Sequence, residues 1–362
     1  MGLSKNTGIV IGNMQKGKNN LITDVPGVKV GHLTLSKGEI QTGVTAILPH
    51  EGNLFREKVM AGSCVINGFG KSVGLIQLNE LGTIETPILL TNTLSVGTAV
   101  TALVKYMLKQ NEDIGVSTGT VNSLVMECND GKLNDIRGLH IKEKHVTDAL
   151  ESASIIFEEG AVGAGRGMCC LGVKGGIGSA SRVLQMDGTR YTVGVLVLSN
   201  FGERGDLILA GNPVGKCIRQ MQDEEKTQKE TEKCQSAFES GERDQGSIIM
   251  VVATDLPLNE RQLKRTAKRA GAGLARTGSF YGNGSGDIAV AFSTTNRVPH
   301  YSEKDILETK MIYDEHLDSV FRATAEASEE AILSSLYHAE SVVGVRGSVR
   351  KGLREYLDRI QE

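Results

Sequence analysis

One serine in the sequence has the type and position of a nucleophile that is created by cutting the chain. Ser247 follows a long charged tract and opens the run "SIIMVVATD", which is almost entirely apolar. An uninterrupted apolar run of this length is typical of a strand buried on both faces. If the bond between Gly246 and Ser247 is cut, Ser247 becomes a chain terminus at the end of a rigid strand. Its α-amino group, with an ordinary pKa of about 7.7–8.0, can then take the proton from its own hydroxyl.

The same hydroxyl can make the cut. Attack of Ser247 Oγ on the preceding carbonyl converts the amide into an ester, and water then releases the upstream chain. Gly246 suits this step because it presents no side chain and accepts strained conformations. A serine at a strand edge, or an exposed loop before it, usually has no such role. Their combination here favours self-cleavage into chains 1–246 and 247–362.

The charged tract before the serine covers residues 222–246. It holds eight acidic and four basic residues in 25, and Phe238 is its only large apolar side chain. Such a segment cannot bury enough apolar surface to offset the entropy of ordering it. We therefore expect a solvated or disordered processing loop, which interrupts one domain of residues 1–362 rather than joining two.

Strands and helices alternate along the rest of the chain. Nearly continuous apolar runs predict buried strands at 193–198, 248–253 and 288–293. A basic helix is expected after Pro257, and periodic apolar positions predict helix in the C-terminal third. The sequence thus predicts an α/β protein in which two packed sheets are covered by helices.

Composition excludes several classes of protein. The net charge of −3 over 362 residues argues against a nucleic-acid partner. No stretch is long and apolar enough for a signal peptide or a membrane span, so a cytoplasmic location is expected. The six cysteines and seven histidines show no zinc-ligand spacing, and neither a metal nor an organic cofactor is predicted.

Several ordered motifs resemble one family. The run "QGSIIMVVATDLPL" is followed by "GSGDIAVAFST", and "ITDVPGVKVGH", "ETPILLTNTLSVG", "ECNDGKLNDIRG", "GAVGAGRGMCC", "KGGIGSASR" and "VLVLSNFG" precede them. Over roughly residues 19–345 the chain resembles the L-aminopeptidase/D-esterase (DmpA-type) and β-peptidyl aminopeptidase family. The resemblance implies a four-layer αββα sandwich of the N-terminal-nucleophile type. It also implies self-cleavage before Ser247 and a homotetramer of processed chain pairs.

The resemblance assigns catalytic roles by position. Ser247 matches the nucleophile, and Ser285 in "GSGD" matches a second hydroxyl that orients it and relays protons. Asp287 matches an acidic position, glutamate in some relatives, that holds the amino group and the second serine. Asn200 in "LSNFG" matches the side-chain amide of the oxyanion hole, where a donor stabilises the tetrahedral intermediate.

Two further positions relate to the substrate. Glu127 in "ECND" matches a carboxylate that receives the ammonium group of the substrate. Asn129 stands where relatives are expected to carry an aromatic or aliphatic pocket residue. The expected substrates are small peptides and amino-acid amides or esters with a free amine.

Three functions fit these residues. The main hypothesis is a serine aminopeptidase that removes an N-terminal residue through an acyl-enzyme on Ser247. An acyltransferase of the ornithine acetyltransferase type would use the same chemistry with an amine acceptor, but those enzymes carry threonine at this position. An uncut, non-enzymatic scaffold that docks partners through the charged tract is the third. Cleavage and turnover would separate it from the other two.

Overall fold

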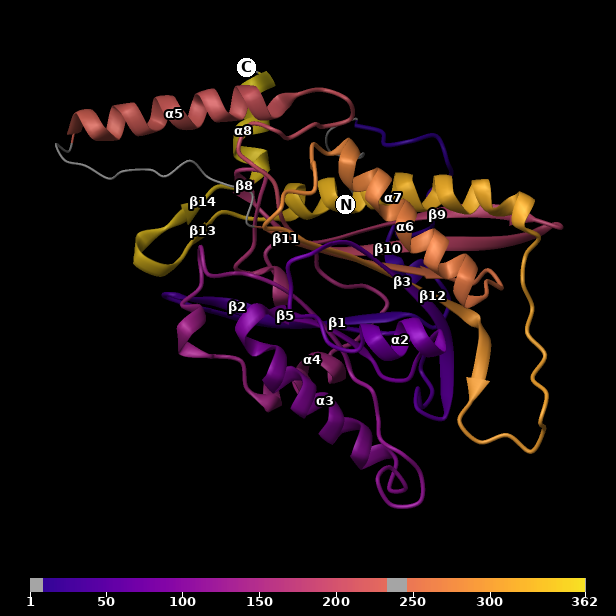
Figure 1. Cartoon of the computed structure of the whole chain (residues 1–362). Helices are drawn as coiled ribbons and strands as arrows, with labels where there is room; N and C mark the ends of the chain where they lie inside the picture. The colour runs from indigo at the N-terminus through magenta and orange to yellow at the C-terminus, as the bar shows by residue number, and fades with distance from the viewer. Residues whose placement is uncertain (1–8, 233–245, 362) are drawn as a thin grey trace.

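The computed structural model of the chain describes residues 9–232 and 246–361. Two large sheets pack face to face between two layers of helices (Figure 1). The smaller sheet has the strand order β1-β2-β5-β6. Its strands are β1 (Lys29–Lys37), β2 (Ile40–Leu48), β5 (Ile88–Asn92) and β6 (Leu124–Cys128).

The larger sheet has six strands in the order β4-β3-β12-β11-β10-β9. The central strand β11 runs antiparallel to β10 and parallel to β12. The strands in this order are β4 (Thr83–Ile84), β3 (Glu57–Gly68), β12 (Gly286–Pro299), β11 (Ser247–Thr254), β10 (Thr189–Asn200) and β9 (Gly176–Met186).

Strand β11 shows why its sequence is apolar at every position. Ile248 and Met250 belong to the core shared with the helices, whereas Ile249 and Val251 belong to the core between the two sheets. Successive side chains of a strand point to opposite faces, so a strand covered on both faces needs apolar residues throughout. The predictions of buried strands at 193–198, 248–253 and 288–293 are confirmed.

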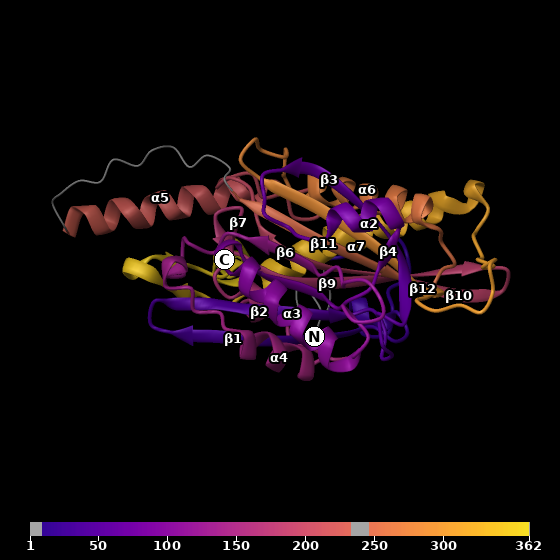
Figure 2. The same ribbon diagram turned by 60° about the horizontal axis from the view of Figure 1, so that its bottom comes forward.

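Helices cover the outer face of each sheet. The helices α6 (Glu260–Arg276) and α7 (Leu317–His338) pack on the six-stranded sheet, and α3 (Val96–Gln110) and α4 (Glu143–Glu151) pack on the four-stranded one. The predicted four-layer αββα sandwich is confirmed, and Figure 2 shows its layers from a second direction. The remaining elements include α2 (Leu75–Leu81), β7 (Cys169–Cys170), β8 (Val173–Lys174), β13 (Val342–Val343), β14 (Val349–Arg350) and α8 (Leu353–Gln361).

The first part of the charged tract is a helix, contrary to expectation. Helix α5 (Val214–Glu232) projects from the body of the molecule (Figures 1 and 2). Glu, Lys and Gln are strong helix formers, and i,i+4 pairs such as Gln220–Glu224 (3.1 Å) support the helix. Its first turns also pack on the core of the protein through Val214, Ile218 and Met221. The helix is also tied to α8, because Glu225 pairs with Arg359 at 2.6 Å. The loop prediction is therefore wrong for 222–232, and residues 233–245 lie outside the described part of the chain.

None of the helices in the described residues is both long enough and apolar enough to cross a lipid bilayer.

Candidate active site

Four strand ends meet at one end of the six-stranded sheet. Asn200, the last residue of β10, pairs with Ser247, the first residue of β11. Ser247 pairs in turn with Gly286 at the start of β12, and Gly286 pairs with Gly68 at the end of β3. Neighbouring strands are about 4.8 Å apart, so these positions form a continuous row. The register thus brings together predicted residues that are far apart in the sequence.

The hydroxyl of Ser247 lies against the carbonyl that it is predicted to attack. Ser247 Oγ donates a hydrogen bond to Gly246 O at 2.7 Å. The backbone N–H of Gly286 points at both groups, with distances of 3.2 Å to Ser247 Oγ and 3.3 Å to Gly246 O. A backbone donor at this carbonyl can stabilise negative charge as it develops on the oxygen. Sequence reasoning missed Gly286, because every residue other than proline carries an N–H.

Only glycine fits at position 246. A Cβ atom there would lie 2.1 Å from the carbonyl oxygen of Asn200 and 2.5 Å from Cα of Phe201. These neighbours are backbone atoms of β10 and the residue after it, and they cannot rotate away as a side chain would. The close approach of two backbones is a characteristic use of glycine. The backbone at the end of β10 is therefore the reason why position 246 has no room for a side chain.

The side-chain amide of Asn200 is held at both ends. Its Oδ1 accepts a hydrogen bond from the backbone N–H of Cys169 at 2.9 Å, and its Nδ2 donates to the carbonyl of Asn129 at 2.9 Å. A backbone N–H can only donate and a carbonyl can only accept, so these partners fix the orientation of the amide. The amide nitrogen carries a second hydrogen, which suits the predicted role as an oxyanion donor.

The second hydroxyl and its carboxylate form a buried pair. Ser285 Oγ donates to Asp287 Oδ1 at 2.6 Å, and both residues are almost fully buried. Asn67 holds the turn that carries Ser285, since its Nδ2 donates to Gly282 O at 3.0 Å and also to Ser285 O. Asn67 was not predicted as a site residue. Its place in the glycine-rich segment "GSCVINGFGKSVG" was the available signal.

Glu127 lies at the end of β6 with its carboxylate already engaged. Its Oε1 accepts from the backbone N–H of Lys71 at 2.8 Å, and its Oε2 accepts from the hydroxyl of Thr93. The next residue, Cys128, donates across the two sheets to Leu198 O at 3.6 Å. Leu198 is two residues before Asn200, so Glu127 belongs to the same end of the sandwich.

The pKa of the Cys128 thiol is affected by both predicted carboxylates. Burial raises its pKa well above the ordinary value, and the carboxylates of Glu127 and Asp287 raise it further. A nearby negative charge disfavours a thiolate in this way. Both predicted carboxylates therefore act on one buried thiol, which links the β6 side of the site to the β12 side.

Asn129 contributes through its backbone. Its carbonyl accepts the hydrogen bond from Asn200, whereas its exposed side chain accepts from the N–H of Gly131 at 2.9 Å. The predicted substrate contact of this side chain stays a prediction. What the structure adds is a main-chain contact that no residue type could have revealed.

The site is enclosed in the uncut chain. Ser247 and Asn200 are each 6% exposed, and Glu127 is 4% exposed. Gly246 is itself buried between β10 and β12.

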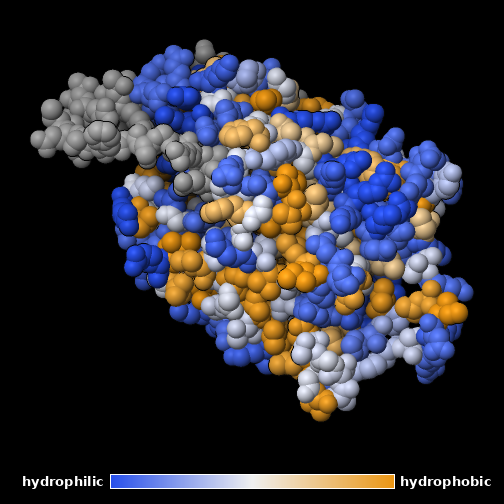
Figure 3. Space-filling model, in the orientation of Figure 1, coloured by the Kyte–Doolittle hydropathy of each residue, from blue (hydrophilic) through white to orange (hydrophobic). Residues whose placement is uncertain are grey.

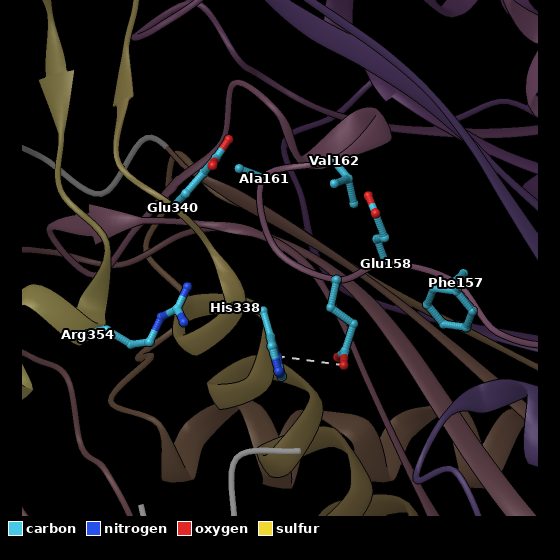
Figure 4. Close-up of a pocket in the computed structure, with 8 residues that line it drawn as sticks. Phe157, Glu158, Ala161, Val162, His338, Glu340 and Arg354 are labelled. Carbon is cyan, nitrogen blue, oxygen red and sulfur yellow. Dashed lines mark ion pairs between the residues drawn. The ribbon is translucent and has the colours of Figure 1, made fainter. Parts of the chain in front are cut away.

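A separate cavity of about 440 Å³ lies between segment 157–162 and the region from the end of α7 to α8 (Figure 4). His338 Nδ1 and Glu159 Oε2 form an ion pair of 3.6 Å beside it. None of the predicted site residues lines this cavity, so it is not the predicted active site. Across 9–232 and 246–361, no group of three or more His, Cys, Asp and Glu side chains is placed to hold a metal ion.

Known proteins resemble this chain over most of its length. The model of "Peptidase family S58" matches residues 20–350. The β-peptidyl aminopeptidase BapA of Sphingosinicella microcystinivorans is 42% identical over 344 residues, which are 91% of this chain and 84% of that protein. The structure of the PH0078 protein from Pyrococcus horikoshii OT3 is 55% identical, with a TM-score of 0.90 over 99% of this chain and 98% of that one.

A third relative has a described fold. The L-aminopeptidase D-Ala-esterase/amidase of Ochrobactrum anthropi is 35% identical, with a TM-score of 0.86 over 99% of this chain and 98% of that one. It is described as a prototype for the serine aminopeptidases and as a variant of the N-terminal-nucleophile hydrolase fold. The family match and these identities agree with the motifs and with the sandwich, and on their combined strength this chain belongs to peptidase family S58.

Proposed function

We propose that this aminopeptidase activates itself by cutting between Gly246 and Ser247 and then uses Ser247 as its nucleophile. As a member of peptidase family S58, the protein is a hydrolase of the aminopeptidase class. The observation that carries the proposal is the contact of 2.7 Å between Ser247 Oγ and the carbonyl oxygen of Gly246. That contact lies at the first residue of a strand whose two faces are both buried.

Self-cleavage begins with attack of Ser247 Oγ on the carbonyl carbon of Gly246. The negative charge on the oxygen is stabilised by the N–H of Gly286. The C–N bond then breaks, the hydroxyl proton passes to the departing nitrogen, and an ester joins the two chains. Water hydrolyses this ester, which leaves a carboxylate on Gly246 and restores the hydroxyl of Ser247. The nitrogen of Ser247 is now a free amine.

Turnover uses that amine as the base. It accepts the hydroxyl proton while Oγ attacks the substrate carbonyl, and the amide of Asn200 donates to the oxyanion. The proton then passes to the leaving amine, and water clears the acyl-enzyme. The hydrogen-bonded pair of Ser285 and Asp287 orients the amino group of Ser247 and carries the proton.

Substrates are recognised by their free amino terminus. Glu127 offers a carboxylate for the ammonium group, and a charge-assisted hydrogen bond of this kind is stronger than a neutral one. Relatives are named as β-peptidyl aminopeptidases and as an L-aminopeptidase with D-Ala-esterase and amidase activity. We therefore propose short peptides, amino-acid amides and esters as substrates, including peptides that begin with a β-amino acid.

The processed chain pairs assemble into a homotetramer in this proposal. Large apolar side chains near the site are exposed, with exposed fractions of 63% for Phe69, 90% for Ile76 and 58% for Phe280. On the face that Figure 3 draws, apolar side chains are gathered in the central and lower part, below α5 and α6. Contact with other subunits would cover such a surface. Light scattering of the purified protein tests the assembly.

The predicted cytoplasmic location stays a prediction.

The proposed function is tested by intact-mass spectrometry with N-terminal sequencing of the fragments. Two species, one ending at Gly246 and one beginning Ser-Ile-Ile-Met, together with hydrolysis of aminoacyl amides, are expected. A single chain of 362 residues that stays intact on long incubation and shows no turnover would overturn the proposal and favour a binding scaffold.

A further inference from the structure

A buried lysine lies behind the predicted oxyanion donor. Lys174 is in strand β8 and pairs with Cys169 of strand β7. Its side chain is fully buried, and Nζ donates to the carbonyl oxygens of Gly165, Met168 and Gly175 at 2.9, 2.8 and 2.7 Å. Three acceptors require three N–H donors, which an ammonium group has and a neutral amine lacks. The geometry is therefore that of a charged lysine.

This charge is held under unfavourable conditions. Burial is the main reason why the pKa of Lys174 is lowered from its ordinary value to about 7, and the guanidinium of Arg166 acts in the same direction. The nearby groups that favour the charge are the thiols of Cys169 and Cys170 and the carboxylate of Asp130. Burying an ammonium group whose hydrogen bonds go only to neutral carbonyls costs free energy, and joining loops does not require a charge. The position of Lys174 next to the peptide that contacts Asn200 indicates its role.

One peptide group connects Lys174 to Asn200. Lys174 donates to the oxygen of Met168, and the N–H of the same peptide group, which belongs to Cys169, donates to Asn200 Oδ1 at 2.9 Å. A charge on the carbonyl oxygen of a peptide makes its N–H a stronger donor, because hydrogen bonds in a chain polarise one another. A stronger bond to Oδ1 in turn makes Nδ2 of the amide a stronger donor.

The hairpin that carries Lys174 is fixed to β10 beside Asn200. The N–H of Leu171, in the turn between β7 and β8, donates to the carbonyl of Phe201 at 2.7 Å. Leu171 and Gly172 have φ angles of 50° and 82°, as two-residue hairpin turns require. The lysine and the amide are thus held in one rigid unit.

We propose that Lys174 is a positioning residue of the aminopeptidase, which polarises the peptide between Met168 and Cys169 and so strengthens the amide of Asn200 as the oxyanion donor. This inference rests on the proposed function, in which Asn200 holds the oxyanion. Lys174 does not touch the substrate. It acts through one peptide and one amide.

A double-mutant cycle tests the proposal. Lys174→Met, Asn200→Ala and the double variant are compared with the wild type on an aminoacyl amide, and each rate is divided by the concentration of cut chain. In the wild-type background, Lys174→Met is expected to lower kcat by roughly 10-fold, a fraction of the 10²–10³ that loss of an oxyanion donor causes. KM should change less than about twofold, and in the Asn200→Ala background the effect on kcat should nearly vanish. An equal loss in both backgrounds, or none in either, would overturn the proposal.

A second measurement keeps the proposal testable if Lys174→Met does not fold. The pH profiles of kcat are recorded for the wild type and for Asn200→Ala. As the pH rises through the pKa of Lys174, the ammonium loses its charge and one of its three donors, so wild-type kcat should develop a falling limb that Asn200→Ala lacks. Asp130, Arg166, Cys169 and Cys170 face this lysine and are unchanged in both proteins. Superimposable profiles would contradict the proposal.

The wild-type protein separates the two levels of inference. If it neither cuts itself nor hydrolyses aminoacyl amides, the proposed function fails. If it does both and the cycle shows no coupling between Lys174 and Asn200, only the role of Lys174 fails.

Discussion

Two regions of this molecule bury polar side chains equally deeply but arrange them in opposite ways. Between β9 and α7, Arg182 Nη2 contacts Glu330 Oε2 at 2.8 Å and Arg182 Nε contacts Glu326 Oε2 at 3.2 Å, so that charges meet opposite charges. At the site end of the same sheet, Ser247 and Asn200 instead bond to backbone carbonyls and N–H groups.

The difference separates stability from chemistry. In the first region each charge is compensated. Glu330 also pairs with Lys16 at 2.6 Å, but removal of Arg182 leaves the buried Glu326 without its cation. In the second region, neutral donors surround places where charge is proposed to appear only during the reaction. Burial of polar groups alone therefore does not identify a functional site. What distinguishes the two regions is whether the buried groups bond to opposite charges or to neutral backbone groups. Substitutions in the Arg182 cluster should therefore lower stability, whereas substitutions at the site end of the sheet should lower the reaction rate.

Ser247→Ala is expected to have the largest effect. Without the hydroxyl the chain should stay uncut, and turnover should fall by a factor on the order of 10⁶, as when a serine nucleophile is removed elsewhere. Thermal stability should stay close to that of the uncut wild type, because the hydroxyl bonds only to the neighbouring peptides. Mass spectrometry and amide hydrolysis measure the two outcomes. Hydrolysis at the normal rate would show that Ser247 is not the nucleophile.

Arg182→Met should affect the other region. Loss of the guanidinium leaves Glu326 and Glu330 buried without their shared partner, which typically costs about 3–5 kcal/mol of stability. The rate per folded, cut molecule should stay unchanged. Arg261→Met is the matched control, since Arg261 pairs with Asp314 on the surface and its loss should cost far less stability than the loss of Arg182. Urea unfolding measures both, and equal losses would remove the distinction between the two regions.

Asn200→Ala should lower kcat by about 10²–10³ with little change in KM, because an oxyanion donor acts mainly in the transition state. Self-cleavage should continue, since the N–H of Gly286 serves that step. The control is Asn296→Ala, which removes another buried amide that donates to backbone carbonyls, including Lys310 O at 2.7 Å. A similar loss of rate in both variants would mean that Asn200 is only structural.

Glu127→Gln should mainly weaken substrate binding. Glutamine keeps an oxygen for the N–H of Lys71 but loses the charge that receives an ammonium group. Charged hydrogen bonds contribute about 1.5–3 kcal/mol, so KM for an aminoacyl amide should rise roughly 10- to 100-fold. An acylated substrate without the amine is the comparison. If its hydrolysis changes by the same factor, Glu127 does not bind the amine.

Asp130→Asn should have a smaller effect that depends on pH. Burial raises the pKa of Asp130 to about 7, so between pH 4 and pH 7 the folded protein holds a proton that the unfolded chain releases. This residue therefore makes wild-type stability fall as the pH rises through that window. Asparagine cannot titrate, so the variant should gain stability relative to the wild type from pH 4 to pH 8. A constant difference in unfolding free energy would contradict this.

Much of the site was predictable because its signals are local. The apolar run of β11 follows from two buried faces, and Gly246 with Ser247 stands at its start in the sequence itself. Asn200, Ser285 and Asp287 lie at strand ends, where short motifs recur within a family. The strand register then brings these residues together without further sequence signals.

The remaining features depend on contacts that residue types do not encode. Gly286 acts through its N–H, Asn129 through its carbonyl, and Lys174 through a peptide group. Asn67 holds three main-chain carbonyls of one turn. The charged tract was expected to lack structure because it has no apolar face. Helix α5 instead begins upstream, where Ile218 is packed in the core, and continues to Glu232 with support from charge pairs and contact with α8.

The strand order has a consequence for the lifetime of the proposed enzyme. After cleavage, β11 and β12 belong to one polypeptide, yet they lie between β3 and β10 of the other. The two products are interlocked, and neither can leave without breaking hydrogen bonds along both of its neighbours. Such a molecule folds most readily before cleavage, when all strands belong to one chain. Once denatured, the cut protein must rebuild each subunit by a bimolecular encounter of two fragments, so its refolding yield should depend more strongly on concentration than that of the uncut Ser247→Ala.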